Sequence, residues 1–228
     1  MLLLNWLEWQ MKKGEIYMAI KKGFLITLEG GEGGGKTTQA VSLYKRLKKA
    51  GKDVVIFREP GCTVISEQIR EVVLSAKNKN IAFTTEVLLF QAARAQIYEE
   101  LVLPSMRAGK VIVMDRSRDS SVVYQGMVRG FGKKMIEQLN NISTSRTLPD
   151  LTLLLDVPVN KGLKRRENSG TINRLDMEAK NFHNKVRKAY LELAEEDKSG
   201  RWRVINAAKS IENVEEQMWE AISDKLGL

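Results

Sequence analysis

Eight consecutive residues near the start of the chain carry a pattern that binds phosphate. Residues 30–37 read Gly-Gly-Glu-Gly-Gly-Gly-Lys-Thr and satisfy G-x-x-x-x-G-K-[ST]. Glycines let the backbone take positive φ and approach a polyphosphate, so that successive N–H groups and the positive end of the following helix face the anion. Lys36 is placed to reach the β- and γ-phosphates of a nucleotide, and the Thr37 hydroxyl is placed to bind a magnesium ion. The pattern therefore predicts a phosphate-binding loop.

The segments on either side of this loop fit the same interpretation. Residues 24–28 form an apolar run typical of a buried strand, and residues 37–50 have the spacing of an amphipathic helix that stops at Gly51. A flexible glycine linker is the alternative. It accounts neither for the strand and helix nor for the Lys-Thr pair at the required offset, and we therefore favour the phosphate-binding loop.

The elements that must position this loop repeat along the chain. Four further apolar, β-branched runs follow at residues 53–57, 111–115, 151–156 and 203–206. Segments of helical length and periodicity lie at residues 85–106, 174–196 and 211–225. Continuous apolar runs suit strands that are covered on both faces, so we expect an α/β fold with a doubly wound parallel sheet. Ligands of such sheets bind beyond the carboxyl ends of the strands, where Gly30, Glu59, Asp115 and Asp156 fall.

Acidic, basic and hydroxyl side chains follow two of these predicted strands. Asp115 and Arg116 are the pair expected to assist a magnesium ion and clamp a phosphate, although an Asp at a strand end also serves as a helix cap. The residues after them that offer hydroxyl, phenol and amide groups for a base and sugar are Ser120, Ser121, Tyr124 and Gln125. In Arg58-Glu59-Pro60-Gly61 a turn leaves Arg58 able to hold an acceptor phosphate.

Phe90 and Arg94 are four residues apart and share one face of a predicted helix. The ring can stack on a base while the guanidinium bonds to its carbonyl edge. Considered by itself, Phe90 also fits a core position.

Composition limits the class of protein. A chain of 228 residues with 43% hydrophobic and 29% charged residues fits one globular domain with a sizeable core. The net charge of +9 suits bound nucleotides and does not by itself indicate nucleic acid, for which no base-reading motif is present. With a single cysteine, Cys62, we expect a cytoplasmic location. His183 is the only histidine, and we assign it no chemistry.

The first 22 residues precede the predicted domain. Apolar residues in this segment are interrupted by Asn5 and Glu8, so it resembles neither a cleavable signal nor a membrane span. We expect a weakly ordered extension, with Met18 a possible start, and a domain over residues 23–228. Deleting residues 1–17 is then expected to leave activity intact.

Several motifs taken together closely resemble the thymidylate kinase family, from about residue 23 to the C-terminus. These motifs are residues 24–38, Arg58-Glu59-Pro60-Gly61, residues 88–94, Asp115-Arg116 with Ser120-Ser121 and Tyr124-Gln125-Gly126, and Pro149-Asp150 before a strand. The resemblance implies a three-layer P-loop NTPase-type fold with a five-stranded parallel sheet flanked by helices. It also implies ATP- and Mg²⁺-dependent conversion of dTMP to dTDP, a mobile lid and a homodimer, with no nucleic-acid or membrane partner.

The resemblance also implies roles for individual residues. Residues matched to ATP contacts are Gly30, Gly31, Glu32, Gly33, Gly34, Gly35, Lys36, Thr37, Thr38, Asn206 and Ala207, and those matched to the metal are Thr37 and Asp115. Residues matched to dTMP contacts are Arg58, Glu59, Pro60, Phe90, Arg94, Arg116, Ser120, Ser121, Tyr124 and Gln125. Phe90 would stack on thymine, Arg94 would bond its O4, Tyr124 would disfavour a 2′-hydroxyl, and Glu32 would meet the sugar 3′-hydroxyl and phosphate region.

The lid would span about residues 162–176 and supply arginine to the transferring phosphoryl group. Arg165, Arg166 and Arg174 are available there, and we favour Arg166 or Arg165, while Ser169 stands where the family often has an arginine. The residues expected to act in catalysis are Glu32, Lys36, Arg116, Arg165 and Arg166.

Other functions remain open from the residues alone. A deoxynucleoside kinase is suggested by Asp115-Arg116-Ser117, but the Arg58-Glu59-Pro60-Gly61 turn favours a monophosphate acceptor. A GTPase lacks support because Asn-Lys-x-Asp is absent. A nucleotide-binding protein with a decayed active site is the remaining alternative, motivated by the unusual lid.

Overall fold

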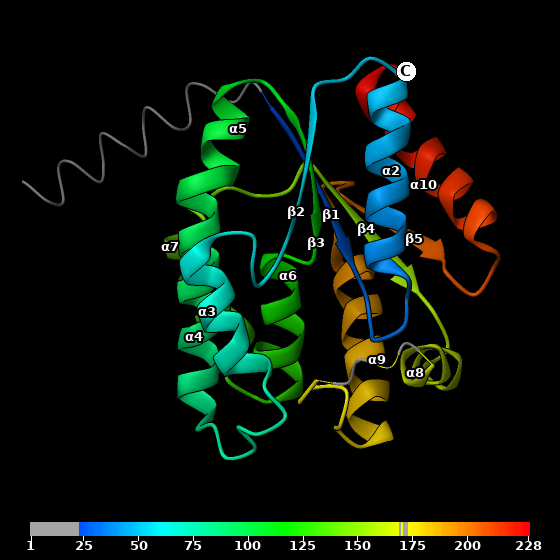
Figure 1. The fold of residues 1–228 in the computed structure, drawn as a ribbon. Helices are drawn as coiled ribbons and strands as arrows, with labels where there is room; N and C mark the ends of the chain where they lie inside the picture. The colour runs from blue at the N-terminus through cyan, green and yellow to red at the C-terminus, as the bar shows by residue number, and fades with distance from the viewer. Residues whose placement is uncertain (1–22, 169, 171–172) are drawn as a thin grey trace, which may run out of the picture.

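The protein is described by a computed structural model over residues 23–168, 170 and 173–228; the segment 1–22 and Ser169 lie outside the described residues. One parallel sheet with the order β2-β3-β1-β4-β5 forms its centre (Figure 1). Its strands are β1 (Phe24–Glu29), β2 (Val54–Arg58), β3 (Val111–Asp115), β4 (Leu151–Asp156) and β5 (Trp202–Asn206). The five apolar runs thus form the strands that the sequence predicts.

The strand register brings the polar strand ends together. Arg58 pairs with Asp115, Asp115 pairs with Leu28, and Asp156 pairs with Asn206. The carboxyl ends of all five strands therefore meet at one edge of the sheet, as parallel pairing requires.

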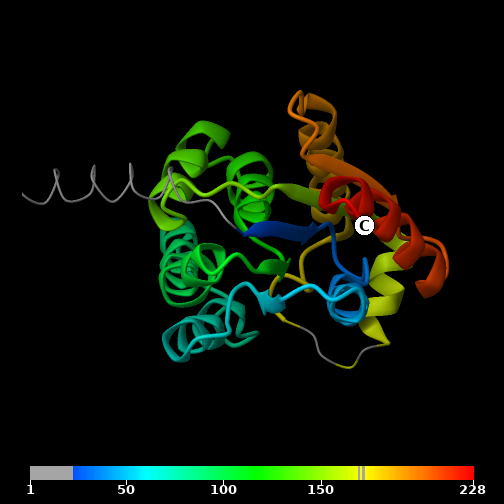
Figure 2. The same cartoon turned by 90° about the horizontal axis from the view of Figure 1, so that it is seen from above.

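Helices cover both faces of the sheet and make a three-layer α/β fold (Figures 1 and 2). One face carries α2 (Lys36–Lys49) and α10 (Ile211–Leu226). The other face carries α4 (Phe83–Ile97), η1 (Tyr98–Val102), α5 (Leu103–Arg107), η2 (Val122–Val128) and α9 (Lys180–Glu196), where η1 and η2 are π-helical. The remaining helices are α3 (Val64–Leu74), α6 (Arg118–Ser121), α7 (Lys133–Ser143) and α8 (Val159–Glu167).

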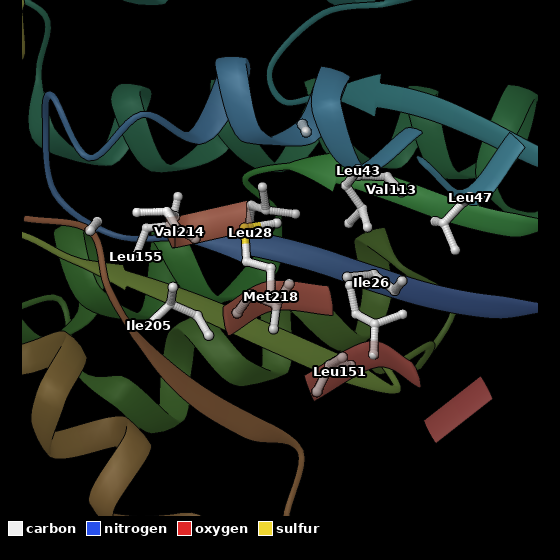
Figure 3. Packing of buried hydrophobic residues seen from close by; sticks show 14 of the residues in the cluster. Ile26, Leu28, Leu43, Leu47, Val113, Leu151, Leu155, Ile205, Val214 and Met218 are labelled. Carbon is white, nitrogen blue, oxygen red and sulfur yellow. The ribbon is translucent and has the colours of Figure 1, made fainter. Parts of the chain in front are cut away.

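Strand β1 shows why its apolar run is continuous. Ile26 and Leu28 pack with Leu43 of α2 and Met218 of α10 (Figure 3), whereas Leu25 packs with the helices of the opposite face. Both sides of the strand are buried, so neither set of alternate positions can be polar without a partner.

The helix predictions need two corrections. Residues 85–106 were expected as one helix, but the structure inserts the π-helical η1 before Pro104, which lacks the N–H of a regular α-helix. The helix expected from 174 begins only at Lys180. The reason is local, because the Asn173 side chain accepts hydrogen bonds from the N–H groups of Leu175 and Asp176 and holds a turn. Helices α3, α6, α7 and α8 were not predicted.

Candidate active site

A cavity of 680 Å³ lies at the carboxyl edge of the sheet. Its walls come from the phosphate-binding loop, the end of β2, helices α3 and α4, the segment from β3 to η2, α8, and the turn between β5 and α10. Segments that are far apart in the sequence therefore line one cavity.

The phosphate-binding loop has the backbone conformation that its glycines allow. Gly33 and Gly35 have φ of 67° and 83°, and Gly35 is the N-cap of α2. Lys36 Nζ donates to the carbonyl oxygens of Gly30 and Gly31 at 3.0 and 2.7 Å. Burial, followed by the charge of Arg116, lowers the pKa of Lys36 to about 8. The ammonium is thus desolvated and donates to backbone carbonyl oxygens, with the carboxylates of Glu32 and Asp115 nearby.

Helix α8 rests directly on this loop through two glycines. A Cβ on Gly33 would overlap the carbonyl of Gly162, and a Cβ on Gly162 would overlap the carbonyl of Glu32. Only glycine on both segments lets the two backbones approach this closely.

Two oxygen-bearing side chains lie together where the loop enters α2. Thr37 Oγ1 donates to Asp115 Oδ2 at 2.5 Å. Among the described residues no group of three or more His, Cys, Asp or Glu side chains could hold a metal. A hydroxyl and one carboxylate fit Mg²⁺ that is held mainly by nucleotide phosphates and water.

Arg116 joins the two sides of the cavity. It follows β3 with φ of 67°, a left-handed conformation uncommon outside glycine. Its Nη2 donates to Glu32 Oε1 at 2.8 Å and its Nη1 donates to the Gly30 carbonyl at 3.1 Å. The guanidinium therefore ties the segment after β3 to the phosphate-binding loop.

Glu32 is ionised within this cluster. Burial alone would raise the pKa of its carboxyl, but Arg116, Lys36 and the hydroxyl of Tyr124 lower that pKa to about 2. Tyr124 donates to the same Oε1 atom at 3.0 Å. Glu32 thus supplies negative charge among cations that would otherwise repel one another.

Arg94 is fixed by an array of acceptors around it. Nε donates to Glu59 Oε2 at 2.8 Å, Nη1 to Asn140 Oδ1 at 2.8 Å, and Nη2 to Ser121 Oγ at 3.1 Å. Both members of the Arg94–Glu59 pair are nearly inaccessible, with side-chain exposures of 2% and 4%. Phe90, one turn earlier on α4, lies in the lining with Arg94. The buried ion pair with Glu59 therefore fixes the orientation of the Arg94 guanidinium.

Gln125 is held in a similar way from a neighbouring helix. Its Nε2 donates to Glu86 Oε1 at 2.8 Å, and Glu86 Oε2 accepts from Arg174 Nη2 at 2.5 Å. Arg174 also donates to the Val73 carbonyl. Arg174 is thus bound to α3 and α4 and is not part of the cavity lining, so its geometry does not favour contact with a transferring phosphoryl group.

The two other lid arginines do lie in the lining. Arg165 Nη1 donates to the Ala207 carbonyl at 2.9 Å, and Arg166 makes a two-bond ion pair with Asp176, each bond 2.9 Å long. The hydrogen bonds and charge of Asp176, and to a smaller extent the charge of Glu32, raise the pKa of Arg166. Arg166 therefore interacts with the charge of Glu32 at the cavity, whereas Arg165 is bound to a backbone carbonyl of the turn after β5.

Two arginines line the cavity where β2 ends and α3 passes. Arg58 donates to the Pro60 carbonyl at 3.0 Å and to Glu67 at 2.7 Å, and Arg70 of α3 donates to the same Pro60 carbonyl at 2.8 Å. Burial and the adjacent Arg58 lower the pKa of Arg70. This pair of close cations suits an anionic ligand.

Most of the sequence-predicted site residues line the cavity. Three do not: Gly30, Gly31 and Asn206 lie outside the lining, although the Gly30 and Gly31 carbonyls bind Lys36.

Arg70, Glu29 and Asn140 lie in or next to this site and were not predicted from the sequence. Arg70 could have been found if α3 had been predicted, since Thr63 caps that helix by accepting from the Ser66 N–H. Glu29 and Asn140 carry no local sequence signal.

The fold and site are those of a P-loop kinase, with a phosphate-binding loop on one side of the cavity and arginines on the other. A family model described as thymidylate kinase matches residues 28–218. The chain belongs to the thymidylate kinase family, which phosphorylates dTMP with ATP.

A solved structure supports this assignment. The chain is similar to the crystal structure of thymidylate kinase from Ehrlichia chaffeensis at 27% identity and a TM-score of 0.71. The match covers 88% of this chain and 98% of the other. In the described part of the chain, no helix has the length and apolar character needed to cross a membrane.

Proposed function

We propose that the cavity binds Mg²⁺-ATP and dTMP together and transfers the γ-phosphoryl group to the 5′-phosphate of dTMP. The observation that carries this proposal is the position of Arg116, which bridges the phosphate-binding loop and the wall that contains Arg94 and Phe90. An arginine at that junction can neutralise charge on both phosphates as they approach.

The donor nucleotide occupies the loop side. Backbone N–H groups of residues 30–38 face its phosphates, Lys36 exchanges its carbonyl partners for phosphate oxygens, and Asn206 and Ala207 border adenine. Thr37 and Asp115 would hold Mg²⁺, which supplies charge neutralisation at the donor phosphates when bound.

The acceptor nucleotide occupies the opposite side. Phe90 stacks on thymine, and the N–H of Arg94 Nη1 not used by Asn140 is available to the base. Arg58, Arg116 and the additional Arg70 hold the 5′-phosphate. The residues that complete the contacts are Glu59, Pro60, Ser120, Ser121, Tyr124 and Gln125.

The chemistry requires positioning more than covalent participation. An oxygen of the dTMP phosphate forms the new bond to the γ-phosphorus, and the bond to the bridging oxygen breaks to release ADP. The attacking phosphate is already anionic at neutral pH, so no general base is required. Glu32, Lys36, Arg116 and one of Arg165 or Arg166 balance the charge.

We further propose a single kinase domain over residues 23–228 with a lid at about residues 162–176. Bonds from α8 to the turn after β5, at Ala207 and at Ala208, which accepts from Lys161 at 2.6 Å, support the view that α8 moves with that turn. A homodimer and a cytoplasmic location complete the proposal, the latter because one cysteine suits a reducing compartment.

A coupled ATP-consumption assay with Mg²⁺ tests the proposal when dTMP, dUMP, other nucleoside monophosphates and thymidine are offered separately. Turnover is expected on dTMP and not on thymidine. Turnover on thymidine alone would support a deoxynucleoside kinase, and ATP binding without any turnover would support a decayed site.

A further inference from the structure

Glu29, the last residue of β1, is a buried carboxylate to which the proposed function gives no role. It is fully buried next to Arg116 and does not line the cavity. Its Oε1 accepts the backbone N–H of Ser117 at 2.8 Å. Its Oε2 accepts the hydroxyl of Ser120 at 2.6 Å and that of Tyr190, on α9, at 2.8 Å. One carboxylate thus collects three donors from two elements.

Both hydroxyls also contact Arg116. Its Nη1 lies 3.2 Å from Ser120 Oγ and 3.4 Å from the Tyr190 oxygen. A hydroxyl has one hydrogen, and when that hydrogen is given to Glu29 only lone pairs remain to face the guanidinium. The two hydroxyl oxygens also lie 3.0 Å apart, so one hydroxyl can donate to the other, but the remaining hydrogen of the pair still has to be accepted by Glu29. The orientation of the hydroxyl pair as acceptors for Arg116 therefore depends on Glu29 being an acceptor itself.

We propose that Glu29 is a positioning residue that fixes the Arg116 guanidinium through the hydroxyls of Ser120 and Tyr190, without touching either nucleotide. The proposal rests on the phosphate-binding role of Arg116 in the proposed function. It deepens that role by explaining how a long side chain in an unusual backbone conformation keeps one direction.

The surroundings of Glu29 make this arrangement sensitive to protonation. The charged and titratable groups that face it are Lys36, Arg116, Asp119, Tyr190 and Arg201. Burial, followed by the charge of Asp119, raises the pKa of Glu29 to about 7. A protonated Glu29 replaces an acceptor with a donor, and one of the two hydroxyls can then no longer present only lone pairs to Arg116.

The test compares the full chain with Glu29→Gln and Tyr190→Phe, using Tyr44→Phe on α2 as a matched loss of a hydroxyl away from the cavity. Glu29→Gln is expected to lower kcat/KM for dTMP about tenfold, the size of one hydrogen bond to a charged group, with KM for ATP changed less than twofold. Tyr190→Phe is expected to act in the same direction and less strongly. The double variant is expected to be little worse than Glu29→Gln, because both changes act on one guanidinium.

The pH profile supplies a readout that a purely structural role would not move. For the unsubstituted chain, kcat/KM for dTMP is expected to fall below about pH 7 more steeply than for Glu29→Gln. The dTMP phosphate, with a second pKa of about 6, titrates equally with both proteins, so the ratio of the two profiles isolates Glu29.

The proposal would be overturned by parallel pH profiles of kcat/KM for the two proteins. It would also be overturned if Glu29→Gln raised the KM values for dTMP and ATP equally and lowered the melting temperature. If Glu29→Gln and Tyr190→Phe match the unsubstituted chain while Arg116→Ala abolishes turnover, only the role of Glu29 is wrong. If Arg116→Ala is also fully active, the proposed function itself is wrong.

Discussion

The two sides of the cavity are built in different ways. The donor side consists of the phosphate-binding loop, α8 and the turn after β5. Its contacts mainly involve backbone groups, namely the close approach of Gly33 and Gly162 and carbonyl oxygens that accept from Lys36, Lys161 and Arg165. The acceptor side consists of the end of β2, helices α3 and α4, and residues 116–125. It is held by buried side-chain pairs such as Arg94–Glu59. We infer that the acceptor side is organised before ligand binds, whereas the donor side presents backbone groups whose interactions are completed by a bound nucleotide.

Arg116 belongs to both sides, so its loss is expected to have the largest effect. Arg116→Ala should reduce turnover by about 10³-fold or more, on the scale of other arginines that neutralise a transferring phosphoryl group. Steady-state kinetics with both substrates varied is the measurement. Arg203→Ala, an exposed change on β5, serves as the control and should be unaffected. Near-normal turnover of Arg116→Ala would remove the link between the two sides.

On the acceptor side, Glu59→Gln should leave Arg94 without its buried counter-charge. The free energy of unfolding, measured by urea denaturation, is expected to fall by about 3–5 kcal/mol. Relative to the unsubstituted chain, KM for dTMP is expected to rise more than KM for ATP. Glu67→Gln is the matched control, since its pair with Arg58 is about 40% exposed and should contribute only about 0–1 kcal/mol. Equal losses in the two variants would show that the acceptor side is not held by buried charge.

On the donor side, Gly162→Ala should separate α8 from the loop. Alanine normally stabilises a helix relative to glycine by about 1 kcal/mol, so any loss of function must come from the overlap with the Glu32 carbonyl. We expect KM for ATP to rise about tenfold or more and dTMP binding in the absence of ATP to be unchanged. Asn160→Ala, exposed on the same helix, controls for substitution in α8. A larger change in dTMP binding than in ATP binding would contradict the division into two sides.

The smallest predicted effect concerns protons at Lys36. Its pKa of about 8 in the free protein should rise when phosphates replace the carbonyl partners, so binding a non-hydrolysable ATP analogue at pH 8 should take up about half a proton. The uptake should diminish toward pH 6, where Lys36 is already charged. Calorimetry in buffers of different ionisation enthalpy measures this number. A result independent of the buffer, or uptake retained in Lys36→Met, would show that Lys36 does not titrate on binding.

The same contrast explains what could be predicted from the sequence. The phosphate-binding loop of the donor side could be identified because its residues are contiguous and their spacing is itself the motif. The five strands could be predicted because β1 to β4 are largely apolar runs and β5 contains the β-branched pair Val204 and Ile205. Resemblance to a family indicated Phe90 and Arg94, but nothing local to Arg94 showed that Glu59 and Asn140 hold it, since these partners are 35 and 46 residues away.

The lid shows a different limit. Arg165, Arg166 and Arg174 look equivalent in the sequence, and only tertiary contacts separate them. Arg174 binds Glu86 and the Val73 carbonyl from α4 and α3, whereas Arg166 pairs with Asp176 beside the cavity. Helix α8 was missed because six of its nine residues, 162–167, were interpreted as part of the lid.

Calorimetric titration of dTMP into the protein without ATP tests most directly whether the acceptor side is already formed. We predict saturable binding of one dTMP per chain, much weaker binding of thymidine, which lacks the phosphate for Arg58, Arg70 and Arg116, and an unchanged dTMP affinity in Gly162→Ala. If dTMP binds only after an ATP analogue has been added, the acceptor side is assembled by the donor, and the account of two independently built sides is wrong.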